Sequence, residues 1–557
     1  MSDPSGQTED KKLRPGEGGR VVLVCPCPDL AFDVGLLAEG LVRMGMEVRR
    51  LLALCTPEGL AELRRELAEG DFSGMIAACG REVNAGMFDL LAGGRSLKVV
   101  DILGAADLDS AWARLTTPDP SLRGHGVRRS WRREVLVLGG GVGGCQAALD
   151  LADAGLKVYL VDTSLSIGGT MAQLDKTFPT LDCSICILGP KLVEVAAHGN
   201  IELLAYAEVD RLRGRAGHFV VDLTLKPRYV DMSKCVGCGR CAEVCPVIVP
   251  SRWNLNLKPR RSIRIIFAQA VPLVSTIEKD SCLECELCLK ACEHEAINLA
   301  DAPASRRLEV GAIILATGAR PFDPTIKGEY GYGRLPGVLT NLEFERLVCA
   351  TGPTQGSLVT PGGRPVSRLA FIQCVGSRDR RFLPYCSGFC CTASIKEAML
   401  ALEHNPEAEI TIFFNDIRTS GKGFEELYQR ARQAGVRFIK GLPGRLEAGP
   451  EGQLVIFYED QLRGGVGRLT VDLVVLAVGL EAGGSPLPWS DVKPAQDSQG
   501  FYLSRHPQLE PLSSTVPGVF VVGTCQAPKD VSETVTQASA AATQVLKMLA
   551  TLEGDEL

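Results

Sequence analysis

Short apolar runs alternate with helical patterns over residues 20–104. The runs lie at residues 21–25, 48–55, 73–80 and 97–103. They are rich in Val, Leu and Ala, and polar or amphipathic segments of helical length separate them. This βαβαβαβ rhythm predicts a parallel sheet with helices on its faces, in a Rossmann-like α/β domain at residues 19–115.

Two polar stretches flank this domain. Residues 1–18 have no apolar signal core, so we expect a disordered lead to a cytoplasmic protein. Residues 116–133 carry several Pro and Arg residues and predict a linker.

The α/β pattern starts again after the linker, and a Cys-rich stretch interrupts it. We predict one α/β domain in three pieces, a Cys-rich insertion, and a further α/β region of similar type. The three pieces are expected at residues 134–230, 306–365 and 491–557, the insertion at 231–305 and the further region at 366–490.

A glycine-rich turn follows the first strand of the three-piece domain. Gly139, Gly141 and Gly144 fit G-x-G-x-x-G, and Asp162 ends the next strand 23 residues after Gly139. The first glycine permits a tight turn, the second lets the backbone approach a pyrophosphate, and the third lets helix and strand pack closely. Asp162 is expected to bind ribose hydroxyls. The pattern predicts a dinucleotide site at the helix N-terminus.

Two further segments favour FAD as this dinucleotide. Residues 314–321 (ILATGARP) resemble the ATG element of two-dinucleotide-domain flavoproteins of the thioredoxin-reductase type. Residues 518–542 (GVFVVGTCQAPKDVSETVTQASAAA) resemble their closing strand and helix. Those proteins usually carry Gly-Asp after the closing strand, where this chain has Gly523 and Thr524.

Two residues of the closing segment are candidates for flavin chemistry. Lys529 lies just before the closing helix, where a cation would stabilise a reduced, anionic flavin. The alternative is that Lys529 caps a loop in solvent. Cys525 lies beside the same segment and is a second candidate catalytic residue.

The chain has 21 cysteines, and 12 of them fall in three groups. In a cytosolic chain such grouping predicts metal ligation or redox chemistry. Two groups follow the bacterial ferredoxin pattern C-x2-C-x2-C-x3-C, whose fourth Cys binds the other cluster. We expect one [4Fe-4S] cluster on Cys235, Cys238, Cys241 and Cys292, and a second on Cys282, Cys285, Cys288 and Cys245. Four of the eight would also satisfy zinc, but the doubled pattern favours iron–sulfur clusters.

The third group of cysteines lies near the start of the further α/β region. Its members are Cys374, Cys386, Cys390 and Cys391. After the strand at residues 368–373 the chain reads CVGSR, in place of a glycine fingerprint. We infer that this region does not take NAD(P)H and holds a third [4Fe-4S] cluster. A metal-free redox disulfide between Cys390 and Cys391 is the alternative.

Several cysteines fall outside these groups. The N-terminal domain carries Cys25, Cys27, Cys55 and Cys79. Three of them are expected at the carboxyl ends of parallel strands, where they either face a cluster, bind iron or pack as small apolar residues. Cys183 and Cys186 form a C-x-x-C, for which a redox role, a part in cluster assembly and plain packing all remain open.

Charge and hydropathy exclude other classes of protein. The net charge is −6, and there is no basic excess that would indicate binding to nucleic acid or to an anionic membrane surface. No apolar run is long enough to span a bilayer. The six histidines are scattered and form no metal-binding motif.

Taken together, these features resemble the A subunit of heterodisulfide reductase. Further strings typical of that family lie at residues 166–191, 246–254, 267–272 and 415–441. The resemblance implies a thioredoxin-reductase-like flavoprotein with an inserted two-cluster ferredoxin domain and an N-terminal α/β domain. The implied cofactor-binding residues are Gly139, Gly141, Gly144, Asp162, Gly169, Thr317, Gly318, Gly523 and Lys529.

In that family FAD takes an electron pair from a partner and divides it between ferredoxin and a higher-potential acceptor. The resemblance therefore implies partners similar to the B and C subunits of heterodisulfide reductase, a hydrogenase-, formate- or NADH-linked donor, ferredoxin, and a second copy of the chain. The alternative is an NAD(P)H-dependent FAD and iron–sulfur oxidoreductase of the glutamate-synthase small-subunit type.

Overall fold

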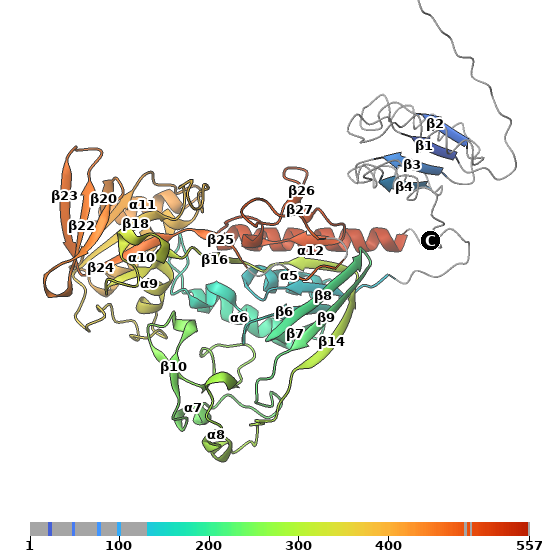
Figure 1. Cartoon of the computed structure of the whole chain (residues 1–557), viewed down its shortest axis with the longest axis horizontal. Helices are drawn as coiled ribbons and strands as arrows, with labels where there is room; N and C mark the ends of the chain where they lie inside the picture. Colours follow the sequence, from blue (N-terminus) through green and yellow to red (C-terminus); the bar gives the residue numbers. More distant parts are fainter. Residues whose placement is uncertain are drawn as a thin grey trace, which may run out of the picture. The chain divides into compact units, whose positions relative to one another are not determined.

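The computed structural model describes residues 131–483, 487–490 and 493–554, together with four short strands nearer the N-terminus (Figure 1). The chain divides into two compact units, Met1–Arg128 and Arg129–Leu557. Among the described residues, no helix is both long and apolar enough to cross a bilayer.

The first unit contains a four-stranded parallel sheet in the order β2-β1-β3-β4. Its strands are β1 (Val21–Val24), β2 (Glu47–Arg50), β3 (Met75–Cys79) and β4 (Leu97–Asp101). The predicted parallel sheet is therefore confirmed. Cys25, Cys27 and Cys55 lie outside the described residues, and Cys79 is the last residue of β3.

A seven-stranded sheet in the order β26-β27-β28-β15-β5-β6-β7 forms the centre of the second unit. The strands from β28 to β7 are parallel, and β27 runs antiparallel to β28. They are β5 (Val135–Leu138), β6 (Val158–Asp162), β7 (Ile201–Ala205), β15 (Ala312–Leu315), β26 (Ser504–His506), β27 (Glu510–Ser514) and β28 (Val519–Val521). All three expected pieces of the domain thus contribute strands to one sheet.

Both faces of this sheet are buried, which explains the uninterrupted apolar run of β5. Val135 and Val137 pack with the helices α5 (Val142–Asp153), α6 (Ser184–Ala197) and α12 (Val531–Gly554). Figure 1 shows α12 lying along α5. Leu136 and Leu138, which alternate with the two valines, pack with a three-stranded antiparallel sheet on the other face. Its strands are β8 (Ala207–Arg215), β9 (His218–Leu225) and β14 (Ala304–Val310).

The Cys-rich insertion leaves this three-stranded sheet after β9 and returns to it at β14. It consists of two short helices and two hairpins. These are α7 (Arg240–Glu243), α8 (Leu287–Ala291), β10 (Ile248–Pro250) paired with β11 (Pro259–Arg261), and β12 (Ile263–Arg264) paired with β13 (Thr276–Ile277). Its small core contains several of the cysteines themselves.

A second parallel sheet has the order β17-β24-β18-β19-β20. Its strands are β17 (Val338–Thr340), β18 (Arg368–Val375), β19 (Glu409–Phe414), β20 (Arg437–Lys440) and β24 (Leu473–Val478). One face packs on α9 (Asn341–Val348), α10 (Cys390–His404) and α11 (Phe424–Gln433). The other packs on an antiparallel meander of β21 (Arg445–Ala448), β22 (Leu454–Glu459) and β23 (Val466–Val471). The pair β16 (Ala319–Pro321) and β25 (Leu480–Ala482) joins this domain to the first.

Residues 174–183, here called the strap, join the 3-10 helix η3 (Gly169–Gln173) to α6 and pack against the second parallel-sheet domain. The ammonium of Lys396 in α10 donates to the carbonyl of Lys176 at 2.9 Å. The same ammonium pairs with Glu345 of α9, and the two side chains are only 2% and 1% exposed. Glu345 also accepts the N–H of Asp175 at 2.9 Å. The strap is therefore held by a buried ion pair.

Candidate functional site

Each glycine of the fingerprint meets a separate steric requirement. Gly139 has φ +104°, and a Cβ there would lie 2.3 Å from the carbonyl oxygen of Ala316. A Cβ on Gly144 would lie 1.8 Å from the carbonyl oxygen of Gly139, so the close approach of α5 requires glycine. A Cβ on Gly141, the N-cap of α5, would meet no atom within 4 Å. The backbone at the helix N-terminus is therefore open to a ligand, and this cradle fits a dinucleotide pyrophosphate.

Asp162 lies at the end of β6 beside this turn. Its Oδ2 accepts the N–H of Gly140 at 2.5 Å, and its Oδ1 accepts the N–H of Ser164 at 2.7 Å. Gly168 donates to the carbonyl of Gly140 at 2.7 Å, and a Cβ on Gly169 would lie 3.0 Å from Cα of Gly141. Asp162 and the pair Gly168 and Gly169 thus border the same glycine-rich turn, as expected for residues that bind one dinucleotide.

The ATG element and the closing segment meet at the carboxyl ends of β15 and β28. Gly318 has φ +77°, and the nearest atom to its Cβ position is Oγ1 of Thr524, 3.9 Å away. Thr317 precedes Gly318 in this turn. Gly523 has φ +73° and donates to Oε1 of Gln537 in α12 at 2.6 Å. The structure therefore brings the two expected flavin segments together.

The two candidate catalytic residues differ in their surroundings. Cys525 is 2% exposed, and its thiol lies 3.2 Å from the carbonyl oxygens of both Leu315 and Val522. Burial raises the pKa of this thiol. Lys529 is half-buried and donates to Oε1 of Gln526 at 3.0 Å, and burial lowers its pKa. Both side chains lie in the closing segment, and their catalytic roles stay predictions.

The start of α12 explains how Lys529 is positioned. Asp530 accepts the N–H of Glu533 at 2.8 Å, and Glu533 accepts the N–H of Asp530 at 3.1 Å. This reciprocal capping box fixes the beginning of the helix directly after Lys529.

The two ferredoxin-type runs repeat in backbone conformation as well as in sequence. Gly237 and Gly239 have φ +71° and +81°, and the corresponding residues of the second run, Glu284 and Glu286, have φ +51° and +60°. Left-handed conformations are unfavourable for glutamate and persist where the surroundings impose them. The equivalent turns therefore curl the chain in the same way around each group of thiols.

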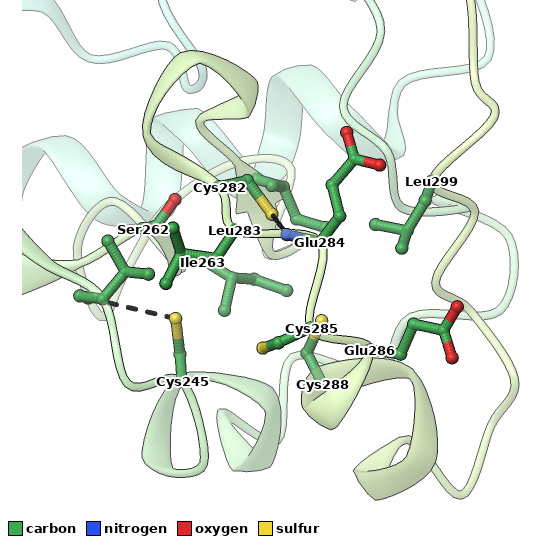
Figure 2. Close-up of a pocket in the computed structure, with 12 residues that line it drawn as sticks. Cys245, Ser262, Ile263, Cys282, Leu283, Glu284, Cys285, Glu286, Cys288 and Leu299 are labelled. Carbon is green, nitrogen blue, oxygen red and sulfur yellow. Dashed lines mark hydrogen bonds between the residues drawn. The ribbon is translucent and has the colours of Figure 1, made fainter.

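Figure 2 shows a cavity in the insertion around which four thiols are placed. Three of them, Cys282, Cys285 and Cys288, come from the second run, and Cys245 comes from the first. Apolar residues such as Ile263 complete its lining. This is the set predicted for the second cluster, including the exchange of the fourth cysteine between the runs.

Three of the four thiols predicted for the first cluster lie in the small core of the insertion, together with thiols predicted for the second cluster. Cys235 and Cys292 pack against the core residues that include Cys241, while Cys238 is exposed. The Sγ of Cys241 lies 3.2 Å from the hydroxyl of Ser275. In the part of the chain that the structure describes, no three Cys, His, Asp or Glu side chains converge as ligands of a single metal ion.

The third group of cysteines lies at the carboxyl edge of the second parallel sheet. Cys374 is next to last in β18 and has φ +58°. Cys390 and Cys391 open α10, and their thiols lie 3.6 Å from the carbonyl oxygens of Val478, which ends β24, and Asp416, which follows β19. All four cysteines of the group, including Cys386, are free thiols. The carboxyl edge is where open α/β sheets bind their ligands.

The electrostatics of the third group involve a residue that the sequence did not single out. Burial raises the pKa of Cys391 to about 11 and that of Cys374 above its ordinary value. The guanidinium of Arg378 opposes both increases, and it pairs with Asp416 at 2.8 Å. Arg378 belongs to the CVGSR string, so the position was visible in the sequence although its role was not.

One pair of cysteines is oxidised in the structure. Cys183 and Cys186, at the start of α6, form a disulfide, whereas the fifteen other cysteines in the described part of the second unit are free. Of the remaining singletons, Cys145 and Cys349 are buried.

The fold and the glycine cradle define a flavoprotein-type oxidoreductase with two dinucleotide-type domains. Residues 133–345 match the pyridine nucleotide-disulphide oxidoreductase family. Thioredoxin reductase of Lactococcus lactis is 16% identical with a TM-score of 0.44, and the comparison covers 75% of this chain and all of that structure.

Curated relatives place the chain more narrowly. It is 47% identical over 413 residues to the A subunit of H(2):CoB-CoM heterodisulfide,ferredoxin reductase of Methanothermobacter thermautotrophicus. It is 48% identical over 423 residues to the iron-sulfur A subunit of CoB--CoM heterodisulfide reductase of Methanocaldococcus jannaschii. The chain belongs to the family of heterodisulfide reductase A subunits. These matches cover 73% and 74% of this chain and 63% and 64% of the relatives, so it spans less than two thirds of their length.

Proposed function

We propose that the chain is the FAD- and [4Fe-4S]-containing electron-transfer subunit of a heterodisulfide-reductase-like complex. When bound, FAD would supply the conversion between two-electron and one-electron transfer, and the clusters would carry the single electrons. This division corresponds to flavin-based electron bifurcation between ferredoxin and a disulfide-type acceptor on partner subunits.

The observation that carries the proposal is the third group of cysteines. Cys374, Cys390 and Cys391 occupy the edge of the second parallel sheet where a nicotinamide nucleotide would enter. A thiol-lined edge suits a third cluster, and the turn after β18 reads CVGSR in place of a G-x-G-x-x-G fingerprint for a second dinucleotide. It therefore favours an electron-relay subunit over a self-sufficient NAD(P)H oxidoreductase.

The flavin would be held by residues from all three pieces of the first domain. The turn at Gly139, Gly141 and Gly144 would bind the pyrophosphate at the N-terminus of α5. Asp162 would orient the ribose, and Lys529 would hold negative charge near the ring at the N-terminus of α12. Further contacts to FAD would come from Gly169, Thr317, Gly318 and Gly523.

The eight cysteines of the insertion would hold two clusters. The cavity bordered by Cys245, Cys282, Cys285 and Cys288 supports the proposed exchange of the fourth ligand between the runs. Together with the third group, the chain would bind about 12 iron atoms, four for each of three clusters.

The names of the relatives suggest which partners to test. They include hydrogen-, formate- and ferredoxin-linked reductases, and each relative is named as the A subunit of its enzyme. We propose proteins similar to the B and C subunits of heterodisulfide reductase, a dedicated electron donor, ferredoxin and a second copy of this chain as partners. Because free cluster-binding thiols persist in a reducing compartment, we also propose that the protein works in the cytoplasm.

Anoxically purified protein provides the test. We expect yellow-brown protein with one FAD and about 12 irons per chain, whose flavin is not reduced rapidly by NADH alone in a stopped-flow experiment. Rapid reduction by NADH without a partner would support the self-sufficient enzyme instead. Colourless protein without iron and flavin would refute both candidates.

A further inference from the structure

The Cys183–Cys186 disulfide lies outside the three groups of cluster cysteines in the sequence. It lies in the first turn of α6, with Cys183 as the N-cap and Cys186 in the helix. Cys186 is exposed and Cys183 is half-buried. The neighbouring Ile187 is 43% exposed, so an apolar surface lies next to the accessible sulfur. A reactant from solution can therefore reach Cys186 before Cys183.

The two sulfurs also differ in their electrostatic surroundings. The sulfur of Cys183 accepts the backbone N–H of Cys186 at 3.3 Å. It lies at the N-terminus of a 14-residue helix, where free N–H groups and the helix dipole favour negative charge. If the disulfide opens, Cys183 is the sulfur better able to leave as a thiolate, because a stabilised thiolate leaves faster.

The helix start is rigidly anchored. Ser184 is fully buried, and its hydroxyl donates to the carbonyl of Met171 in η3 at 2.7 Å. Its N–H donates to the carbonyl of Asp175 in the strap at 2.9 Å. Opening the disulfide therefore does not require the helix to unwind, since both anchors are independent of the sulfur–sulfur bond.

The redox conditions of the compartment in which the protein works distinguish a structural disulfide from a reactive one. The proposed clusters need twelve reduced cysteines in the same chain, and a compartment that keeps these reduced also acts on any accessible disulfide. A disulfide that forms there is catalytic or redox-sensing rather than structural. This step rests on the proposed function, while the geometry of the pair does not.

We propose that Cys183 and Cys186 form a dithiol–disulfide exchange site that reacts with a dithiol carrier, either a small dithiol or a protein with a similar cysteine pair. One thiolate of the carrier attacks Sγ of Cys186, forms a mixed disulfide and releases Cys183 as a thiolate, which takes up a proton. The second thiol of the carrier then attacks the carrier's own sulfur in the mixed disulfide. This step forms the carrier disulfide and releases Cys186 as a thiolate, which also takes up a proton. Two electrons and two protons pass from the carrier to the chain, and the reverse sequence oxidises it.

Peptide mapping gives a direct test, with dithiothreitol as the dithiol probe. Trypsin cleavage after Lys176 and Lys191 releases one peptide, residues 177–191, that contains both cysteines and no other. The holo-protein is equilibrated without oxygen in mixtures of reduced and oxidised dithiothreitol, and its free thiols are alkylated while it is still folded. It is then digested with trypsin, and the mass of the peptide is measured by mass spectrometry. We expect this peptide to change from no adduct to two adducts reversibly, while Cys349→Ser, which removes a buried cysteine elsewhere, leaves the change unaltered.

Single variants test the order of attack. Treated with oxidised glutathione at a pH high enough to ionise either thiol, Cys183→Ser should form a mixed disulfide at Cys186 at least ~10-fold faster than Cys186→Ser forms one at Cys183, because Cys186 is exposed and Cys183 is half-buried. A peptide that resists reduction until the protein is unfolded would show a structural disulfide and overturn the proposal. So would a peptide that stays reduced in oxidised dithiothreitol. Iron and FAD content is measured on the same samples, so a failure of the proposed function is recorded separately.

Discussion

The buried pair of Lys396 and Glu345 allows a quantitative test of how the two dinucleotide-type domains are joined. Replacing Lys396 with Met removes the ammonium but keeps most of the apolar stem. The two side chains are 2% and 1% exposed, so the carboxylate of Glu345 would remain buried without its ion-pair partner. Removing one member of a buried pair costs roughly 3–5 kcal/mol. The variant also loses the hydrogen bond to the carbonyl of Lys176.

A matched control lies in the strap itself. Lys176 pairs with Glu403, but these side chains are 27% and 46% exposed. Lys176→Met removes a cation of the same kind from solvent-accessible surroundings, where an ion pair contributes about 1 kcal/mol or less. The difference between the two Lys→Met variants therefore isolates the effect of burial.

The double variant Lys396→Met with Glu345→Gln removes both charges. It should recover most of the stability lost in Lys396→Met, because the main cost is the unpaired charge rather than the missing pair. Urea unfolding followed by circular dichroism gives the free energies of unfolding for the comparison. If Lys396→Met cost no more than Lys176→Met, or if the double variant recovered nothing, the reasoning would be refuted.

Three further predictions concern single side chains. Burial, together with the nearby Glu345 carboxylate, raises the pKa of Glu397 well above 4.5, so the stability that this carboxyl contributes is complete below pH 4.5 and is lost as pH rises toward the folded-state pKa. Glu397→Gln should therefore be more stable than the parent at neutral pH, with a flatter pH profile of urea midpoints; an unchanged profile would contradict this. Cys390→Ser should lower bound iron from about 12 to about 8 atoms per chain, and unchanged iron and electron paramagnetic resonance spectra would exclude the third cluster. Gly144→Ala should abolish FAD retention after gel filtration, because its Cβ would lie 1.8 Å from a carbonyl oxygen; a variant that keeps FAD would show that α5 can move away.

Local sequence signals predicted much of the fold because the physical constraints behind them are local. The tight contact of Gly144 with the carbonyl of Gly139 arises within one strand–turn–helix unit, so the spacing of the glycines was sufficient to indicate the cradle. The approach of Gly139 to Ala316 joins residues far apart in the chain and was not visible in this spacing. The parallel sheet of the N-terminal unit follows from alternating apolar runs in the same way. The doubled Cys pattern likewise fixes two similar turns, whose repeated left-handed residues the structure shows.

Other features depend on residues far apart in the chain. Lys396 and Glu345 look like ordinary surface residues in the sequence, and only the packing of α9, α10 and the strap buries them together. Similarly, β17 lies before the residues expected for the second parallel-sheet domain, yet it pairs with β24. A three-residue strand has too little pattern to reveal its partner.

The strap has a consequence for the proposed electron transfer. Lys396 and Glu345 both belong to the second parallel-sheet domain, so a swing of one dinucleotide-type domain against the other would pull the strap away from this buried pair. It would break the hydrogen bonds from Lys396 to the carbonyl of Lys176 and from the N–H of Asp175 to Glu345 in a nearly water-free environment. These contacts of the strap therefore oppose changes in the spacing between the flavin cradle and the thiols on α10. For the proposed complex we therefore expect the timing of each electron transfer to depend on neighbouring subunits and on local protonation rather than on a hinge.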